Sequence, residues 1–380
     1  MLHDIDLPSP LLAGLSPQRF MQRHWQKKPL LVRSAVADPQ PLLERRQLFE
    51  LAGRDEVESR LIVREGKRWT MRRGPLPRRA LPPVSQREWT LLVQGVDLHH
   101  APARQLLEQF RFVPDARLDD LMISWASDGG GVGPHFDSYD VFLLQLQGRR
   151  RWRIGRQDDL TLQQGVPLKI LANFVPQQEY VLEPGDMLYL PPGYAHDGTA
   201  LGECQTCSIG FRAPGRSELA RELMQRLAEE AEDATGAALY RDAGASAADS
   251  PGSVPAGLQR FAAQSVQAVL KDPHALNRVL GEYLSEPKAN VWFEPGRSPA
   301  SIGAVVLDRR SRMLHDGRHV FLNGDSWRAS GRDATLMRAL ADQRQLSLAQ
   351  VGRASEGALE LLRDWCEAGW LHSQQEDRDD

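Results

Sequence analysis

The sequence predicts an α+β protein: an antiparallel β-barrel with flanking helices, then a helical region, then a module of helices and a hairpin. Between residues 118 and 212, strand-like runs alternate with Gly/Pro turns, which is typical of an antiparallel barrel. After Pro214 and Gly215 the apolar spacing becomes that of amphipathic helices. A chain of 380 residues suggests two or three domains. We expect a barrel domain over 1–215, a helical region over 216–290 and a winged-helix-like domain over 291–380.

The first 110 residues are expected to mix short helices with connecting loops. Helices are predicted over 41–51, with Pro41 at a first helical position, and over 86–110. Further along, a leucine stripe predicts a helix over 217–232, and a second amphipathic helix is expected over 258–285. The segment 233–257 between them is rich in Ala, Gly, Ser, Asp and Pro, which indicates a connector. Two helices without a complete core of their own favour a homodimer interface over simple packing against the barrel.

The last 90 residues suggest a winged helix. Residues 305–307 and 319–322 flank turn-rich sequence and are predicted to form a hairpin. Helices are expected over 333–343 and 354–368, with Gly369 as a C-cap. The second of these helices is leucine-rich and acidic, whereas phosphate contact favours Lys and Arg, so we expect no direct DNA binding. The final residues, 374–380, are acidic and are expected to be disordered.

Composition indicates a globular protein of a reducing compartment. Hydrophobic residues make up 41% and charged residues 26% of the chain, with a net charge of −3. No apolar run approaches the roughly 20 residues that span a bilayer, and the acidic start of the chain does not resemble a signal peptide. We therefore predict a cytoplasmic protein without a membrane segment. Cys204 and Cys207 form a CxxC pair, but no second pair completes a zinc site, so structural cysteines are expected.

The run Gly133-Pro134-His135-Phe136-Asp137, followed by His196, predicts a metal site. In an extended strand, side chains at i and i+2 share a face, so His135 and Asp137 can bind one ion. His196 comes just after the rigid Pro191-Pro192-Gly193 turn. Two imidazoles and a carboxylate suit a facial triad that holds Fe(II) and leaves three coordination positions open. Either histidine alone is more simply explained as a hydrogen-bonded core residue, but the combined pattern favours metal binding.

This pattern, with further motifs, resembles the cupin-type double-stranded β-helix oxygenases of the JmjC class, and in particular the bacterial ribosomal oxygenases. The further motifs are Phe20-x3-His24-Trp25-Gln26-Lys27-Lys28-Pro29-Leu30, Leu121-Met122-Ile123-Ser124-Trp125, Tyr139-Asp140-Val141-Phe142 and Gly148-Arg149-Arg150-Arg151-Trp152-Arg153. The resemblance is close over about residues 1–215. It implies a jelly-roll barrel that uses Fe(II), 2-oxoglutarate and O2 to hydroxylate the β-carbon of an arginine in a large-subunit ribosomal protein, the sixteenth.

Arg150 is the predicted partner of the cosubstrate. Its parity places it on the same face as Trp152 and Ile154, and a buried guanidinium needs an anion. An internal salt bridge would satisfy it, but the resemblance favours the distal carboxylate of 2-oxoglutarate. Ser124, Thr206 and Ser208 would donate hydrogen bonds to the same molecule.

Three residues are predicted to bind the substrate. Asp120, Met122 and Ser124 share one face of their strand, and the apolar opposite face suits packing against helices. Asp120 would pair with a guanidinium, while Met122 and Tyr139 would sandwich its plane. The simpler interpretations are a strand-end carboxylate for Asp120 and core filling for Met122.

Two other functions stay open on sequence grounds. The first keeps the cofactors but changes the reaction target: the protein would be a lysyl, histidyl or asparaginyl hydroxylase, or a demethylase. Asp120 with an aromatic neighbour favours a cationic target among these. The second is a metal-containing cupin without catalysis that serves as a regulator. The presence of Arg150 with all three members of the triad argues against it.

Overall fold

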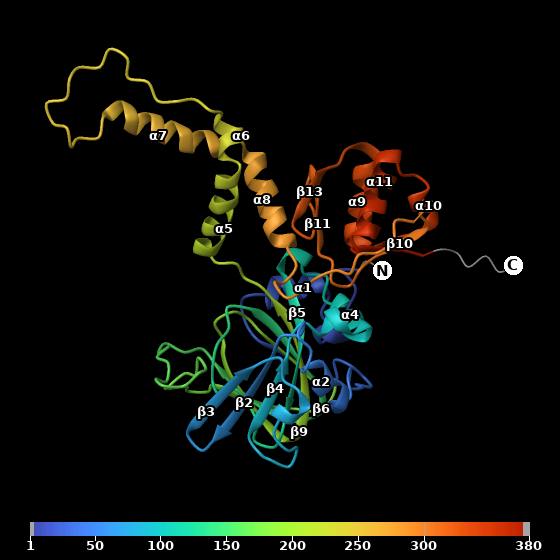
Figure 1. Ribbon diagram of the computed structural model, residues 1–380. Helices are drawn as coiled ribbons and strands as arrows, with labels where there is room; N and C mark the ends of the chain where they lie inside the picture. Colours follow the sequence, from blue (N-terminus) through green and yellow to red (C-terminus); the bar gives the residue numbers. More distant parts are fainter. Residues whose placement is uncertain (1–3, 300, 375–380) are drawn as a thin grey trace. The chain divides into compact units, whose positions relative to one another are not determined.

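Two long neighbouring strands form the centre of the barrel. β6 (Asp140–Gly155) and β9 (Ala195–Phe211) pair antiparallel along most of their lengths. The computed structural model describes residues 4–299 and 301–374. Its main sheet has nine strands in the order β1-β8-β6-β9-β5-β4-β2-β3, with β7 also paired to β6 (Figure 1). The other strands are β1 (Leu30–Val32), β2 (Ser59–Glu65), β3 (Arg68–Arg73), β4 (Trp89–Val93), β5 (Leu118–Ala126), β7 (Gln178–Leu182) and β8 (Met187–Leu190).

A bend in the β6–β9 ladder lets these two strands serve both walls of the barrel. Register shifts on either side of Gln147 divide the ladder into two blocks. Gly148 follows, with a φ of +63°, and a Cβ placed on it would lie 2.1 Å from the carbonyl oxygen of Glu203. Only glycine fits such a position without strain, and bulges of this kind bend a strand. The predicted barrel with flanking helices is confirmed.

Short helices belong to the same unit as the barrel: α1 (Pro17–Arg23), α2 (Arg45–Leu51), α3 (Val96–His99) and α4 (Ala101–Glu108), with 3-10 turns at Pro10–Leu12, Arg78–Ala80 and Asp115–Arg117. Leu121, Ile123 and Trp125 of β5 are fully buried in one apolar cluster with helix residues such as Phe20 and Leu107. Because side chains alternate along a strand, Met122 and Ser124 face the other side. The predicted division into two faces is confirmed from Leu121 to Trp125, whereas a register irregularity between Leu118 and Leu121 interrupts the alternation at Asp120.

A second apolar cluster occupies the inner side of the barrel wall. It contains Val141 and Leu143 from the first half of β6 and Trp152 and Ile154 from the second half. Arg150 has the same parity as Trp152 and is also buried, whereas Arg149 is exposed and Arg151 and Arg153 are half-buried. The predicted inward face of this strand is confirmed.

The prediction for residues 1–110 is wrong in part, since β1 to β4 all belong to the main sheet. β4 lies inside the segment 86–110 that the sequence predicts as one helix. All five of its side chains are buried, so no polar alternation marks it as a strand. The predicted helix over 41–51 begins only at Arg45, where the Gln47 side chain accepts a hydrogen bond from the backbone N–H of Glu44.

The chain divides into two compact units. The first runs to Ala213 and includes the short segment Ala289–Trp292; the second comprises Pro214–Lys288 and the chain from Phe293 onward. The division into three domains, with boundaries at 215 and 290, stays a prediction. Over residues 4–299 and 301–374, no helix has both the length and the apolar content to cross a bilayer.

Four helices begin the second unit: α5 (Arg216–Glu229), α6 (Ala231–Thr235), α7 (Ala256–Val269) and α8 (Pro273–Ser285) (Figure 1). The single helix predicted over 258–285 is two helices. Asp272 accepts a hydrogen bond from the backbone N–H of His274 and so caps α8, and Pro273 occupies its first turn. α8 packs on α5, whereas α7 has no buried residue.

The rest of the second unit has two small sheets and three helices. β10 (Ala304–Leu307) pairs with β14 (Gln345–Leu346) and β15 (Leu371–Gln374), while β12 (His319–Leu322) pairs with β11 (Met313–His315) and β13 (Asp325–Arg328). The predicted hairpin between 305–307 and 319–322 is therefore wrong, because β11 is the strand that precedes the turn. The helices are α9 (Gly331–Gln343), α10 (Leu348–Val351) and α11 (Glu356–Glu367), and Gly369 has the positive φ expected of a C-cap. The tail predicted to be disordered lies, from residue 375 on, outside the described residues.

A buried carboxylate ties the ends of this module together. Burial acts to raise the pKa of Asp308, but hydrogen bonds from Arg310 and His372 outweigh it and hold the pKa at about 2. The Arg310 Nε–Asp308 Oδ1 distance is 2.8 Å, and His372 Nε2 lies 2.9 Å from Asp308 Oδ2. The ionised form of Asp308 therefore contributes to the stability of this unit.

Candidate metal centre and cosubstrate pocket

The three predicted metal ligands converge in the structure. His135 Nε2 lies 3.8 Å and His196 Nε2 3.7 Å from Asp137 Oδ2. One ligand atom from each residue lies within 4.8 Å of the others. His135 and His196 also form a backbone bridge, with N–O distances of 3.0 and 2.8 Å. The sheet itself thus brings together ligands that are about 60 residues apart in the sequence.

Hydrogen bonds orient both imidazoles toward a common point. His135 Nδ1 lies 2.9 Å from the carbonyl oxygen of Gly133, and His196 Nδ1 lies 3.0 Å from that of Tyr194. A carbonyl oxygen only accepts, so each Nδ1 carries the proton and each Nε2 keeps its lone pair. This is the arrangement that metal-binding histidines usually have.

The electrostatics keep His196 neutral. Its burial, and next the neighbouring His135, lower the pKa of His196 to about 4, although Asp137 acts in the opposite direction. A neutral imidazole is the form that binds a metal. His196 is almost fully buried, whereas Asp137 is partly exposed, so one side of the cluster is open. Two imidazole nitrogens and one carboxylate oxygen on one side of an open site fit Fe(II).

The segment after Asp137 is fixed by a buried carboxylate. Asp140 accepts hydrogen bonds from the Tyr189 hydroxyl at 2.6 Å and the Gln26 amide at 3.0 Å, and it pairs with Arg117. Burial raises the pKa of Asp140. Asp140 is the register partner of Phe211, the last residue of β9. Asp137 is three residues before Asp140, so this network anchors the segment that carries it.

Arg150 lies inside the barrel with 4% exposure. Its Nη2 is 3.6 Å from Cys204 Sγ, its guanidinium carbon is 5.7 Å from the centre of the Trp152 ring, and its Nε has no hydrogen-bond partner. In the described part of the chain, no carboxylate pairs with this guanidinium. The Trp152 ring in turn lies 5.8 Å from that of His196. The Trp152 ring therefore separates the buried Arg150 guanidinium from the predicted metal ligand His196.

The predicted cosubstrate hydroxyls lie on adjacent strands. Ser124 and Thr206 are register partners, and the Ser124 hydroxyl donates to the Thr206 carbonyl at 3.3 Å. The Thr206 hydroxyl donates to Gln145 Oε1 at 2.8 Å. Gln145 is therefore a candidate site residue that the sequence analysis missed; its parity with the buried apolar Val141 and Leu143 is the signal that would have found it. Ser208 is buried one pair further along β9, opposite Met122.

The predicted substrate residues differ in exposure. Tyr139 is 38% exposed, Met122 is half-buried, and Asp120 is 5% exposed. Asp120 Oδ2 accepts a hydrogen bond from the backbone N–H of Gly95 at 3.1 Å, so this carboxylate also has a structural partner. The substrate roles of these residues stay predictions.

Comparison with known proteins agrees with this geometry. The JmjC domain family matches residues 105–219, and the ROXA-like winged helix family matches residues 268–372. The fold and the three convergent ligands thus define a protein with a JmjC-type oxygenase domain.

Similarity to proteins of Escherichia coli extends over nearly the whole chain. The ribosomal protein uL16 3-hydroxylase is 33% identical over 355 residues, which is 89% of this chain and 91% of that protein. A crystal structure of YcfD matches with a TM-score of 0.83 at 30% identity, over 95% of this chain and 99% of that one. The ribosomal oxygenase YcfD in complex with cobalt and 2-oxoglutarate matches with a TM-score of 0.81, also at 30% identity, over 96% of this chain and 99% of that one. The chain belongs to the ribosomal oxygenase family.

Proposed function

We propose that this protein is an Fe(II)- and 2-oxoglutarate-dependent hydroxylase that acts on the β-carbon of an arginine in the ribosomal protein uL16. The observation that carries the proposal is the buried Arg150 guanidinium. Among residues 4–299 and 301–374 it has no carboxylate partner, and the Trp152 ring separates it from an open His/Asp/His cluster. The name of the Escherichia coli relative, a uL16 3-hydroxylase, supports the substrate.

His135, Asp137 and His196 would hold the iron, and each has the geometry for it. The bound iron, with 2-oxoglutarate and O2, would supply the oxidising chemistry at the substrate C–H bond. The protein contributes a neutral donor set that is already oriented by the Gly133 and Tyr194 carbonyls. Because the ligands are ordered by the sheet, little reorganisation accompanies metal binding.

Arg150 would receive the distal carboxylate of 2-oxoglutarate. A planar guanidinium donates two parallel hydrogen bonds to a carboxylate, and the anion removes the cost of an unpaired buried charge. Further hydrogen bonds would come from Ser124 on β5 and from Thr206 and Ser208 on β9. The Thr206 hydroxyl would exchange its bond to Gln145 for one to the cosubstrate.

Asp120, Met122 and Tyr139 would bind the substrate arginine. Asp120 supplies a buried carboxylate for the guanidinium, while Tyr139 offers an exposed ring close to the metal ligand Asp137.

A homodimer and a cytoplasmic location complete the proposal. α7 has no buried residue, and Leu258, Val266 and Leu270 on it or at its end are 38%, 54% and 47% exposed. Apolar surface of this kind favours a second subunit. A ribosomal protein as substrate favours the cytoplasm. The acidic α11 supports the absence of direct DNA binding through that helix.

The test is intact-mass analysis of the large-subunit ribosomal proteins after incubation with enzyme, Fe(II), 2-oxoglutarate and O2. We expect uL16 to gain the mass of one oxygen atom, with fragmentation placing it on an arginine. His135→Ala abolishes the gain, whereas the matched control His315→Ala, at an exposed histidine of the other unit, retains it. The absence of a gain on any ribosomal protein would contradict the substrate while leaving the metal and cosubstrate sites to be tested by binding.

A further inference from the structure

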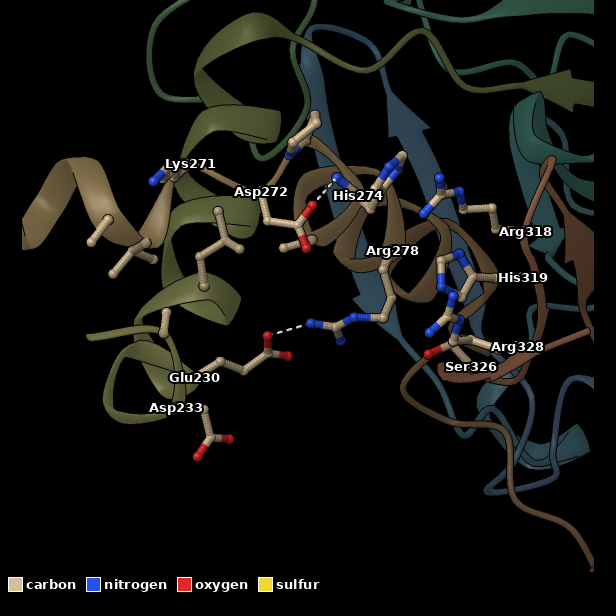
Figure 2. A pocket seen from close by; sticks show the side chains of 16 residues that line it. Glu230, Asp233, Lys271, Asp272, His274, Arg278, Arg318, His319, Ser326 and Arg328 are labelled. Carbon is tan, nitrogen blue, oxygen red and sulfur yellow. Dashed lines mark hydrogen bonds and ion pairs between the residues drawn. The ribbon is translucent and has the colours of Figure 1, made fainter. Parts of the chain in front are cut away.

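A cleft lies entirely within the second unit and plays no part in the proposed reaction. It is an open cleft of about 800 Å³ lined by the end of α5 with α6, the turn between α7 and α8, α8 itself, and the β12–β13 hairpin. Figure 2 shows acidic side chains from α5 and α6 on one side and basic side chains from α8 and the hairpin on the other.

The basic side of the cleft has side chains from both strands of the hairpin. Arg328 is the register partner of His319, so the two side chains share a face, and Arg318 precedes His319 directly. His274 and Arg278 of α8 line the cleft beside them (Figure 2). The guanidinium groups of Arg318 and Arg328 place positive charge at this side of the cleft, which favours an anionic ligand.

Two of the three acidic groups that line the cleft are already engaged. Glu230 pairs with Arg278, which also binds Glu282 at 2.9 Å, and Asp272 is occupied in capping α8. In the described part of the chain, no carboxylate pairs with the guanidinium of Arg318 or Arg328, both of which are exposed. Between these two, His319 is only 7% exposed and its Nδ1 makes no hydrogen bond; the nearest carboxylate oxygen, of Asp316, is 3.5 Å away. The hairpin therefore presents two uncommitted guanidinium groups around a buried imidazole.

We propose that this cleft binds a backbone phosphate of RNA. Two guanidinium groups and an imidazole present several N–H donors to one tetrahedral anion, which is the chemistry that recognises phosphate. The volume is several times that of a phosphate, which leaves room for the attached sugar and base. The exposure of both arginines leaves the cleft open, so that a strand can enter and leave. Asp233 and Glu230 on the opposite side disfavour a second phosphate in the same cleft, as in a di- or triphosphate.

The choice of RNA over a free nucleotide rests on the proposed function, because a hydroxylase of a ribosomal protein meets that protein beside ribosomal RNA. The contact would hold the enzyme on its substrate particle through the second unit. It is independent of the metal site, since none of the residues involved lies in the barrel.

The test measures RNA affinity of the full-length protein without iron or cosubstrate. A fluorescein-labelled single-stranded RNA 12-mer is titrated by fluorescence anisotropy over a range of NaCl concentrations. Because both arginines contact one phosphate of a single strand, we expect Arg318→Gln/Arg328→Gln to make the slope of log K against log salt shallower by about 0.7 in total, with Kd at low salt rising on the order of tenfold. The control Arg332→Gln/Arg353→Gln removes the same charge from exposed positions outside the cleft and leaves slope and Kd near the wild-type values.

Two further measurements identify the ligand. Inorganic phosphate is expected to displace the RNA more effectively than NaCl of equal ionic strength, and Asp233→Asn is expected to strengthen RNA binding by removing an opposing charge. RNA affinity that is absent, or equal in the two double variants, overturns the proposal. Stabilisation of the protein by AMP in a thermal shift assay, together with no RNA binding, overturns the RNA assignment in favour of a free nucleotide. Because activity is not measured, failure of the hydroxylase proposal leaves this result unaffected.

Discussion

Replacing Arg150 by methionine separates the effect of the buried charge on folding stability from its contribution to 2-oxoglutarate binding. Met has a similar length but no charge. In the protein without cosubstrate, the guanidinium has a thiol and an aromatic ring as neighbours and an Nε without a partner. Removing such a charge from a site with 4% exposure is expected to raise stability by about 1–3 kcal/mol.

The same substitution, Arg150→Met, should weaken the binding of 2-oxoglutarate. Two charge-assisted hydrogen bonds, at a lower bound of about 1.5 kcal/mol each, give about 3 kcal/mol, or a roughly 150-fold increase in the Kd of 2-oxoglutarate. The assay is isothermal titration calorimetry with Mn(II) in place of Fe(II), together with thermal unfolding of the metal-free protein.

The matched control is Arg151→Met, on the same strand but on the opposite, half-buried face. It is expected to leave the Kd of 2-oxoglutarate within about threefold of wild type, because a half-exposed charge away from the pocket contributes little. The reasoning is refuted if Arg150→Met binds 2-oxoglutarate as tightly as the control does, or if Arg150→Met lowers the melting temperature sharply.

Three further predictions concern packing and charge. Cys204→Leu enlarges a fully buried side chain beside the Arg150 guanidinium. Since overpacking costs about 1–3 kcal/mol, calorimetry should show 2-oxoglutarate binding weakened by about tenfold. The control Cys204→Ala should keep the Kd of 2-oxoglutarate within about threefold of wild type. Asp308 has a pKa of about 2, below its unfolded value, so its contribution of about 2 kcal/mol is fully present above the unfolded pKa of 3.8 and is lost as the pH falls toward 2. Asp308→Asn should lose this contribution at pH 7 and flatten this part of the pH–stability curve measured by urea unfolding. Gly148→Ala should lower thermal stability by several kcal/mol, because its Cβ would clash with a backbone carbonyl, while Gly202→Ala, also at positive φ but with open space around it, should cost only about 1–2 kcal/mol; equal losses would contradict the clash.

The metal ligands could be predicted from the sequence because their information is local. His135 and Asp137 are two residues apart, and His196 follows a rigid turn, so the pattern survives without knowledge of the fold. Arg150 could be predicted by strand parity for the same reason. In each case the chemistry depends on one strand or one turn, and the sheet then adds the long-range contact.

Other features depend on tertiary contacts that no local pattern encodes. Trp89 to Val93 form a strand because neighbours cover both of its faces, and an apolar run of five residues fits a buried helix equally well. The Gln145 bond to Thr206 joins positions 61 residues apart. The cleft formed by α5 to α8 and the β12–β13 hairpin brings together segments whose charges look like ordinary solvated surface when each is considered alone.

The backbone bridge between the two histidine ligands has a consequence for metal exchange. Since their amides and carbonyls bond to each other, each imidazole is anchored through its own main chain and through a carbonyl two residues earlier. These contacts would keep the donors assembled without an ion. Incorporation of iron would then depend on supply and on competition among divalent ions, rather than on refolding.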